Sequence, residues 1–489
     1  MTFAVMDLVW QAPVLILAIT GLFLVLAESF ASGTSRKFMM KLAVAGCVLA
    51  AVVAVMAWRK LGGQPRSLMG GMLIADSFGM FMIILFSVIT ALTALASADY
   101  MDEHQFETGE YYAVLLLSAT GMGILAMAGD LVTVFIGIET MSIGAYVLIA
   151  SRRRSRRSAE AAMKYFLMGA FATAFLLYGI ALVYGAIGST DLGIISARVS
   201  AYSSDPLLIT GIFFILVAFG FKVAAFPFHM WTPDAYEGAP TPITGFMAAG
   251  VKAAAFAGMI RVLADTFGGD VLPYGYMGWA GLIAATAAIT MTIGNVAALR
   301  QENVKRMLAY SSIAHAGTML VAVAAMGVGA MTEARPALLY YVVAYSITSV
   351  GAFAVATWVG SRGDERTLVD DWSGLAQSRP GAALAMTIFM LSLGGIPPIA
   401  GFFGKFYVFR AAMAADDNQL MWLVIVGVLN SVISIFYYLR LVTAMYFRDP
   451  LREHKTLTSP TTVFVFLFCA LVVLQMGLFP GWWLGKAMI

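Results

Sequence analysis

The sequence predicts an all-α, polytopic membrane protein with about 14 transmembrane helices. Of its 489 residues, 61% are hydrophobic and only 12% are charged, whereas roughly 25% of the residues in soluble domains are charged. The mean hydropathy of +0.86 indicates that lipid is the solvent for most of the chain. No span alternates strictly between apolar and polar residues as a membrane β-strand does, so every span is predicted to be a helix. Soluble, disordered and nucleic-acid-binding classes are excluded.

A window of about 19 residues finds the candidate spans. They cover residues 13–31, 39–58, 76–98, 111–128, 131–150, 160–187, 206–228, 241–264, 277–298, 305–328, 337–359, 382–413, 420–447 and 461–484. The first is expected to be an uncleaved spanning helix, because Asp7 lies where a signal peptide has basic residues.

The basic residues predict the orientation. Loops after odd-numbered spans hold 17 Lys and Arg residues with the adjoining span ends, against 8 on the other side. The positive-inside rule therefore places the odd loops in the cytoplasm and both termini outside. The basic run from Arg152 to Arg157 is interpreted as a topology anchor, with anionic-lipid binding as the alternative.

Four charged residues are predicted near the middle of the membrane. Each costs ~2.5–3.5 kcal/mol there, so together they impose a penalty on the order of 10–14 kcal/mol that packing alone would not maintain. They are Glu139, Lys222, Lys252 and Lys405. Lys164 lies nearer a span end, where snorkelling to the lipid headgroups is the simpler interpretation.

Two of these lysines lie beside predicted helix breaks. Pro227 follows Lys222 in GFKVAAFPFHMW, and Pro397 and Pro398 precede Lys405 in LSLGGIPPIAGFFGKF. Broken backbone at membrane depth is tolerated where it is buried in protein or lines a wet cavity. A lysine beside each break predicts a hydrated ion path, and a proline kink used only for packing is the alternative.

The order of the elements predicts an inverted repeat. A break falls in the fourth of five spans twice, and an odd number of spans makes the second set begin on the opposite face of the membrane. We expect residues 1–110 to form three N-terminal helices, 111–265 the first repeat, 277–447 the second repeat and 461–489 a C-terminal helix. The two halves are not obviously alike in sequence, so this prediction depends on element order.

The central charges predict proton transfer. Desolvation disfavours a charged amine and a nearby carboxylate favours it, so such an amine can be loaded and unloaded. We expect Glu139 and Lys222 to pair, and their separation to favour release towards Lys252 and then Lys405. A Na⁺ path is disfavoured because Na⁺ sites use carboxylates and carbonyls rather than a line of lysines.

Two histidines lie near this path. His315 is inside the tenth span and His229 follows the first break. An imidazole relays protons near neutral pH, and a satisfied core histidine is the alternative for each.

Sequence motifs for redox or hydrolytic chemistry are absent. The chain has no G-x-G-x-x-G, G-K-[ST], H-E-x-x-H or G-x-S-x-G pattern. Its two cysteines, Cys47 and Cys469, are too few for a cysteine-ligated Fe–S cluster or an all-thiolate zinc site. We therefore expect no cofactor and no metal in this chain.

Five stretches give the chain a family resemblance. It resembles the antiporter-like membrane subunits of respiratory complex I, and among them most closely the subunit N group of bacterial NADH:quinone oxidoreductase. The stretches are FIGIETMSIGAYVLIA, SAEAAMKYFLMGAFATAFLLYG, FKVAAFPFHMWTPDAYEGAPTPITGFMA, KRMLAYSSIAHAG and LSLGGIPPIAGFFGKFYVF.

The resemblance implies a unit of a proton pump driven by quinone reduction in other subunits. Glu139 and Lys222 would be the channel pair, Lys252 the central relay and Lys405 the terminal site, with Lys164 and His315 in support. NADH, FMN, Fe–S clusters and quinone are expected in partner subunits, and K- and M-type subunits and lipids as neighbours. The implied location is the bacterial inner membrane, with both termini periplasmic.

Two alternatives stay open at this point. A subunit of an Mrp-type cation/proton antiporter shares these motifs. A non-pumping scaffold of the membrane arm, with vestigial charges, is the second.

Overall fold

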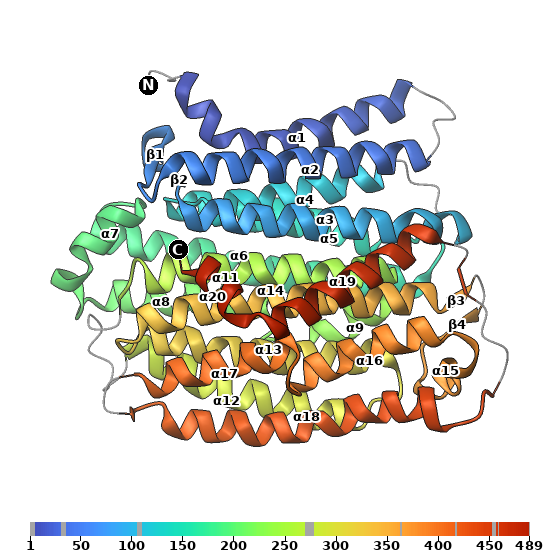
Figure 1. Ribbon diagram of the computed structural model, residues 1–489. Coiled ribbons are helices and arrows are strands. Elements are labelled where there is room, and N and C mark those ends of the chain that lie inside the picture. Colours follow the sequence, from blue (N-terminus) through green and yellow to red (C-terminus); the bar gives the residue numbers. More distant parts are fainter. Residues whose placement is uncertain are drawn as a thin grey trace.

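The computed structural model describes residues 5–30, 36–104, 110–268, 278–361, 364–415, 418–451, 456–457 and 459–488. Figure 1 shows long helices that run side by side, with α1 and α2 at one edge of the bundle and α18 at the opposite edge.

Residues 5–259 contain the α-helices α1 to α11. They are α1 (Val5–Phe30), α2 (Arg36–Leu61), α3 (Ser77–Glu103), α4 (Tyr111–Ala126), α5 (Leu131–Ile149), α6 (Arg156–Ile187), α7 (Leu192–Arg198), α8 (Pro206–Val223), α9 (Trp231–Gly238), α10 (Thr241–Phe246) and α11 (Lys252–Met259). A hairpin of β1 (Arg66–Leu68) and β2 (Leu73–Ala75) connects α2 to α3, with Arg66 opposite Ala75.

The second part continues in the same way. Its α-helices are α12 (Gly278–Leu299), α13 (Val304–Met326), α14 (Met331–Trp358), α15 (Leu375–Ser378), α16 (Pro380–Gly394), α17 (Ala400–Met413), α18 (Met421–Phe447), α19 (Pro460–Leu478) and α20 (Pro480–Ala487). The short strands β3 (Gly360–Ser361) and β4 (Asp364–Glu365) pair antiparallel after α14.

The helices agree with the predicted spans. Every predicted span overlaps at least one helix, and 12 helices in the described part of the chain are long and apolar enough to cross a membrane. Two further apolar helices, α4 and α16, are shorter. The prediction of an all-α, multi-pass membrane protein is confirmed, whereas the count of 14 crossings and the inverted repeat stay predictions.

Both predicted breaks are present. Helix α8 ends at Val223 and α9 begins at Trp231, while α16 ends at Gly394 and α17 begins at Ala400. Proline lacks the N–H that would continue each helix and its ring clashes with the preceding turn.

The span from Thr241 to Ala264 is continuous but irregular. Two π-helical stretches interrupt it, η3 (Met247–Val251) and η4 (Ile260–Ala264). Such wide turns are rare and often occur at functional sites. Lys252 is the first residue after η3.

Glycines allow α4 and α5 to approach closely. A Cβ at Gly121 would lie 2.3 Å from the backbone nitrogen of Met141, and one at Gly137 would lie 2.7 Å from that of Leu125. Helices in membranes associate largely through such close packing of small residues.

Gly121→Ala should therefore destabilise the bundle by about 1–3 kcal/mol, the usual cost of overpacking, because backbone atoms cannot move aside as a flexible side chain would. The check is the thermal midpoint of the purified complex that contains the variant. Gly185→Ala is the matched control, since a Cβ there meets nothing within 4 Å. Equal midpoints for the two variants would contradict the close-packing argument.

Candidate functional site

The three predicted central lysines lie inside the bundle. The exposed fractions of Lys222, Lys252 and Lys405 are 3%, 3% and 7%. Glu139 on α5 is partly buried. Because the lysine side chains are enclosed by protein, snorkelling to lipid headgroups does not account for them.

Lys222 and Lys405 each lie beside the end of a half-helix. Lys222 is in the last turn of α8. The Lys405 ammonium donates to the carbonyl oxygen of Gly394, the last residue of α16, at 3.3 Å. The C-terminal carbonyls of a helix stabilise a cation, and interrupted membrane helices use these ends to hold ions.

Gly395 explains how α16 can end against Lys405. Its φ of +77° is in the left-handed region, and a Cβ there would lie 3.0 Å from Cδ of Lys405. Glycine adopts this conformation without a steric cost, so the chain can turn directly over the lysine.

A serine, rather than the predicted carboxylate, is the hydrogen-bond partner of Lys222. Its ammonium donates to Oγ of Ser142 at 2.7 Å, and Glu139 accepts a hydrogen bond of 2.5 Å from Oγ1 of Thr173. Ser142 follows Glu139 by one helical turn, so the two partners lie on one face of α5. Glu139 and Lys222 are near enough to interact electrostatically, but they form no direct ion pair among the described residues.

Lys252 is held by α13. Its ammonium donates to the carbonyl oxygen of Ser312 at 2.6 Å and also to the Ser312 hydroxyl. That hydroxyl shares a hydrogen bond of 3.3 Å with the hydroxyl of Tyr236 on α9. The central lysine is therefore connected to the second half of the first broken helix.

His315 lies between the central and terminal lysines. It is near enough to both Lys252 and Lys405 to interact with them electrostatically. Together with Lys405 it lines a cavity of about 10 Å³, roughly the space that one water molecule requires. The structure thus brings the predicted histidine and the terminal lysine to one polar cavity.

The proline residues of the breaks face outwards. Pro227, Pro397 and Pro398 are exposed on the isolated chain. The lysine beside each break, rather than the proline, is buried in the bundle, and the hydrated path expected at the breaks stays a prediction. His229 lies between α8 and α9, and its buried Nδ1 has no hydrogen-bond partner in the part of the chain that the structure describes.

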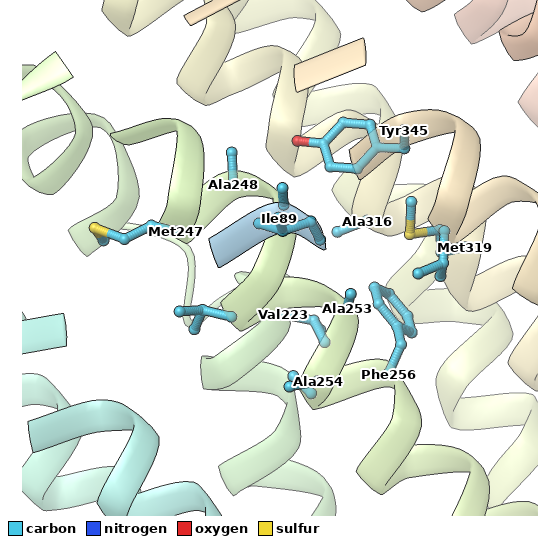
Figure 2. Close-up of a cluster of buried hydrophobic side chains, with 14 of the residues drawn as sticks. Ile89, Val223, Met247, Ala248, Ala253, Ala254, Phe256, Ala316, Met319 and Tyr345 are labelled. Carbon is cyan, nitrogen blue, oxygen red and sulfur yellow. The ribbon is translucent and has the colours of Figure 1, made fainter. Parts of the chain in front are cut away.

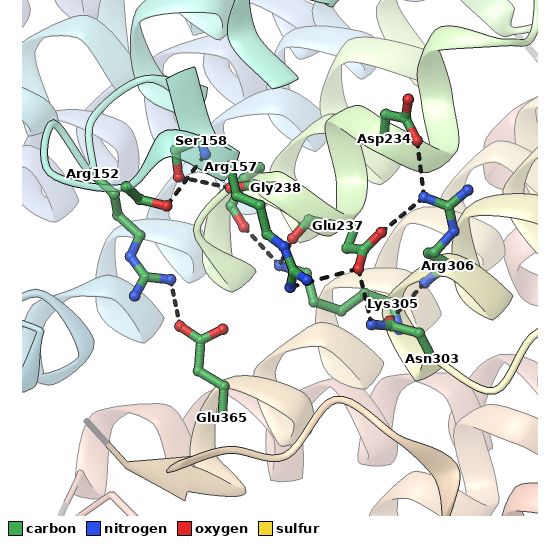
Figure 3. Close-up of polar contacts among 12 residues, drawn as sticks. Arg152, Arg157, Ser158, Asp234, Glu237, Gly238, Asn303, Lys305, Arg306 and Glu365 are labelled. Atoms are coloured by element: carbon green, nitrogen blue, oxygen red, sulfur yellow. Dashed lines mark hydrogen bonds and ion pairs between the residues drawn. The ribbon is translucent and has the colours of Figure 1, made fainter. Parts of the chain in front are cut away.

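Lys164 belongs to a charged cluster, not to the buried row of lysines. Its ammonium pairs with Glu160 at 2.7 Å and with Asp234 at 2.9 Å. In Figure 3 the guanidinium of Arg306 lies between Asp234 and Glu237, at 2.9 and 2.8 Å. These pairs connect α6, α9 and α13.

The same charged cluster caps the C-terminal end of α9. Lys305 is buried and donates to the carbonyl oxygens of Glu237 and Ala239 at 3.0 and 2.6 Å, which satisfies backbone acceptors that a helix end leaves free. In the nearby strand β4, burial raises the pKa of Glu365, but the charges of Arg152 and Lys305 and the hydrogen bond from Arg152 outweigh it, so the pKa is lowered. Arg152 and Glu365 form an ion pair there (Figure 3).

Apolar side chains surround the backbone around Lys222 and Lys252. Figure 2 shows Val223, which follows Lys222, in one cluster with Ala253 and Phe256 from the helix of Lys252. No hydrogen bond connects the two lysines within the described residues. The polar groups of the path are therefore interrupted at this step.

Comparison with known proteins gives the family. Residues 128–434 match the family model described as NADH:quinone oxidoreductase/Mrp antiporter, transmembrane. A relative from Sorangium cellulosum, named NADH-quinone oxidoreductase subunit N 1, is 44% identical over 97% of this chain and 97% of its own length. The chain belongs to the subunit N family.

Solved membrane-complex structures share the fold of this chain. A chain of respiratory complex I from Thermus thermophilus with bound Aureothin has a TM-score of 0.81 and 33% identity, over 97% of this chain and 98% of that one. A chain of the Mrp complex from a Dietzia species has a TM-score of 0.85 over 99% and 97% of the two chains. Its identity of 21% indicates a shared fold alone.

The site of this subunit N family member also contains residues that the sequence did not single out. They are uncharged hydroxyl groups that join the predicted charges, namely Ser142, Tyr236, Ser312, Tyr341 and Tyr438. Charge inside an apolar span is visible in a sequence, whereas a serine or tyrosine is unremarkable there. Only the run AYSSIAHAG gave a signal, because its serines lie within one turn of His315.

Proposed function

We propose that this chain is the proton-translocating N-type subunit of the membrane arm of an NADH:quinone oxidoreductase. The observation that carries the proposal is the pair of buried lysines beside two helix breaks, together with a third buried lysine and a histidine that interacts with it and with Lys405. Intramembrane ionisable residues that face the bundle interior mark ion and proton pathways.

The proposed path follows the order of the buried groups. Glu139 and Lys222 form the entry pair through their electrostatic interaction, with the Lys222 ammonium held by Ser142. Lys252 is the central relay, and Lys405 is the terminal site. His315 hands protons between the last two. The exposed Lys164 acts indirectly, since it shares Asp234 with Arg306.

The interruption between Lys222 and Lys252 has a role in this scheme. A pump must prevent protons from leaking back, and moving one charge against 100 mV costs ~2.3 kcal/mol. The apolar cluster around Val223 and Ala253 (Figure 2) provides a dry step that conducts only when water enters or side chains rearrange. His229, whose Nδ1 is unpartnered within the described residues, lies beside the break that such a rearrangement would move.

The energy for pumping comes from partner subunits in this proposal. NADH, FMN, Fe–S clusters and quinone belong to them, and K- and M-type subunits are the neighbours in the membrane. Large apolar side chains at both edges of the bundle support lateral contacts with subunits or lipid: Phe23 on α1 is 54% exposed and Phe436 on α18 is 64% exposed (Figure 1).

The location and the repeat are parts of the same proposal. The excess of Lys and Arg in odd loops supports a bacterial inner-membrane protein with both termini periplasmic. The two helix breaks, each followed or preceded by a buried lysine and each in the fourth of five spans, support the division into repeats 111–265 and 277–447.

An Mrp-type antiporter subunit is the second candidate function, favoured by the family model that covers both classes. Copurification distinguishes these two candidate functions. Gentle detergent extraction followed by mass spectrometry should find the chain with flavin- and Fe–S-containing subunits. Recovery only with other antiporter subunits would contradict the proposal.

Lys222→Met should greatly reduce NADH-driven proton translocation while the complex still assembles, because Met fills the space of the side chain but holds no proton. The measurement is proton uptake by inverted membrane vesicles, with assembly followed on native gels. Lys486→Met is the matched control, since Lys486 is exposed in the last turn of α20. Unchanged uptake in the assembled Lys222→Met complex would favour the scaffold alternative.

A further inference from the structure

Two tyrosine hydroxyls from different helices hold the imidazole of His315. Its Nδ1 lies 2.6 Å from Oη of Tyr341 on α14, and its Nε2 lies 3.0 Å from Oη of Tyr438 on α18. All three side chains are buried, with exposed fractions of 3% or less. Both ring nitrogens therefore have a hydroxyl partner that can either donate or accept.

Tyr438 also reaches back towards the central lysine. Its hydroxyl shares a hydrogen bond with the hydroxyl of Ser311, the residue before Ser312 on α13. Ser312 receives the ammonium of Lys252. Two consecutive serines thus contact the central lysine on one side and Tyr438 on the other.

We infer that Tyr438 is a proton-relay residue that joins Ser311, beside the Lys252 site, to His315 and the cavity of Lys405. The inference rests on the proposed function, because it assigns one step of that proton path. It adds a tyrosine on α18, an outer helix of the bundle, to a path whose other proton carriers are lysines, a carboxylate and a histidine (Figure 1).

The transfer balances as follows. The O–H bond of Tyr438 breaks as an N–H bond forms at Nε2 of His315, and the Tyr438 oxygen takes a proton from the Ser311 hydroxyl. On the other side of the ring the Nδ1–H bond breaks, its proton passes to the Tyr341 oxygen, and the Tyr341 hydroxyl proton leaves. Thr318, which lies beside Tyr341 and lines the cavity, accepts that proton while its own hydroxyl proton, now donated to the Ala314 carbonyl, turns towards Lys405.

Proton transfer from Lys252 to Ser311 is the step at which this relay can be switched on or off. Ser311 is re-protonated from Lys252 through Ser312, and the two serine hydroxyls share no hydrogen bond among the described contacts. A rotation of the Ser312 hydroxyl is needed to close that gap. The same hydroxyl contacts Tyr236 on α9, so movement of the broken helix would open or close the relay.

Tyr438→Phe tests the relay in the intact complex in inverted membrane vesicles. NADH-driven proton uptake should fall about tenfold or more, because a positioned acid–base group contributes about 10²–10⁴-fold. NADH oxidation with a soluble electron acceptor that bypasses quinone should stay unchanged. Tyr340→Phe is the matched control: it removes a buried hydroxyl that donates to the Met476 carbonyl at 3.0 Å, away from His315.

A structural role would affect both tyrosines alike, whereas the relay predicts a larger solvent isotope effect on the residual uptake of Tyr438→Phe only. Should that variant fail to assemble, Ser311→Ala breaks the relay from the other side and should slow uptake in the same way. Wild-type uptake in Tyr438→Phe, or in Ser311→Ala, together with lost uptake in Lys252→Met would overturn the relay alone. Wild-type uptake in Lys252→Met as well would overturn the proposed function with it.

Discussion

Proton translocation should fall at least about tenfold when Lys405 is replaced by Met, while assembly of the complex is retained. The amine is the proton carrier at the end of the path, and general acid–base groups contribute about 10²–10⁴-fold. Lys405 forms no ion pair among the described residues, so its replacement by an apolar side chain of similar volume leaves no partner charge uncompensated. The loss of activity is therefore expected without a loss of the folded complex.

The measurement for Lys405→Met is proton uptake by vesicles alongside the amount of assembled complex. Arg410→Met is the control, because Arg410 is an exposed cation in the last turn of the same helix, α17. Normal uptake in the assembled Lys405→Met complex would remove Lys405 from the path. A similar loss in Arg410→Met would point to a general effect of charge on the helix.

Asp76→Ala should destabilise the subunit by about 3–5 kcal/mol, the cost of leaving a buried charge without its partner. Arg261 is 5% exposed and makes two hydrogen bonds of 2.6 Å to the Asp76 carboxylate. The carboxylate also caps α3 by accepting from the Gly79 N–H at 2.8 Å. The variant removes an N-cap and leaves the guanidinium with hydrogen bonds to the Ala126 carbonyl but without its paired carboxylate.

The check for Asp76→Ala is the thermal stability and yield of the complex. Asp370→Ala is the control, since Asp370 pairs with Arg448 where both side chains are more than half exposed, and such pairs contribute only about 0–1 kcal/mol. The double variant Asp76→Leu with Arg261→Met should recover part of the stability. A cost for Asp76→Ala no larger than for Asp370→Ala would show that the Arg261 pair does not hold α3 in place.

The central charges could be predicted because hydrocarbon makes them conspicuous. Lys222, Lys252 and Lys405 are all buried, and each lies in an apolar stretch where a charge is costly. Lys164 was harder to place, and the structure puts it in an ion-pair cluster with Asp234. The position of Lys164 within its span could not reveal this partner, because Asp234 lies 70 residues further along the chain.

The hydrogen-bond partners could not be predicted. Ser142 takes the place at Lys222 that the sequence assigned to Glu139, and Tyr438 reaches His315 from 123 residues along the chain. Partner choice depends on how helices pack and rotate against each other, and polar groups buried in a bundle must satisfy one another wherever they meet.

The sequence by itself determined that this is a helical membrane protein with breaks at two prolines and amines at membrane depth. Those conclusions depend on local quantities: the transfer free energy of each span, the missing N–H of proline and the cost of a charge in lipid. Only the tertiary structure decided which way the lysines point, that Lys405 meets the carbonyl end of α16, and that no hydrogen bond connects Lys222 to Lys252 within the described residues. These features arise between helices distant in sequence, because side-chain contacts are set by packing that no single segment contains.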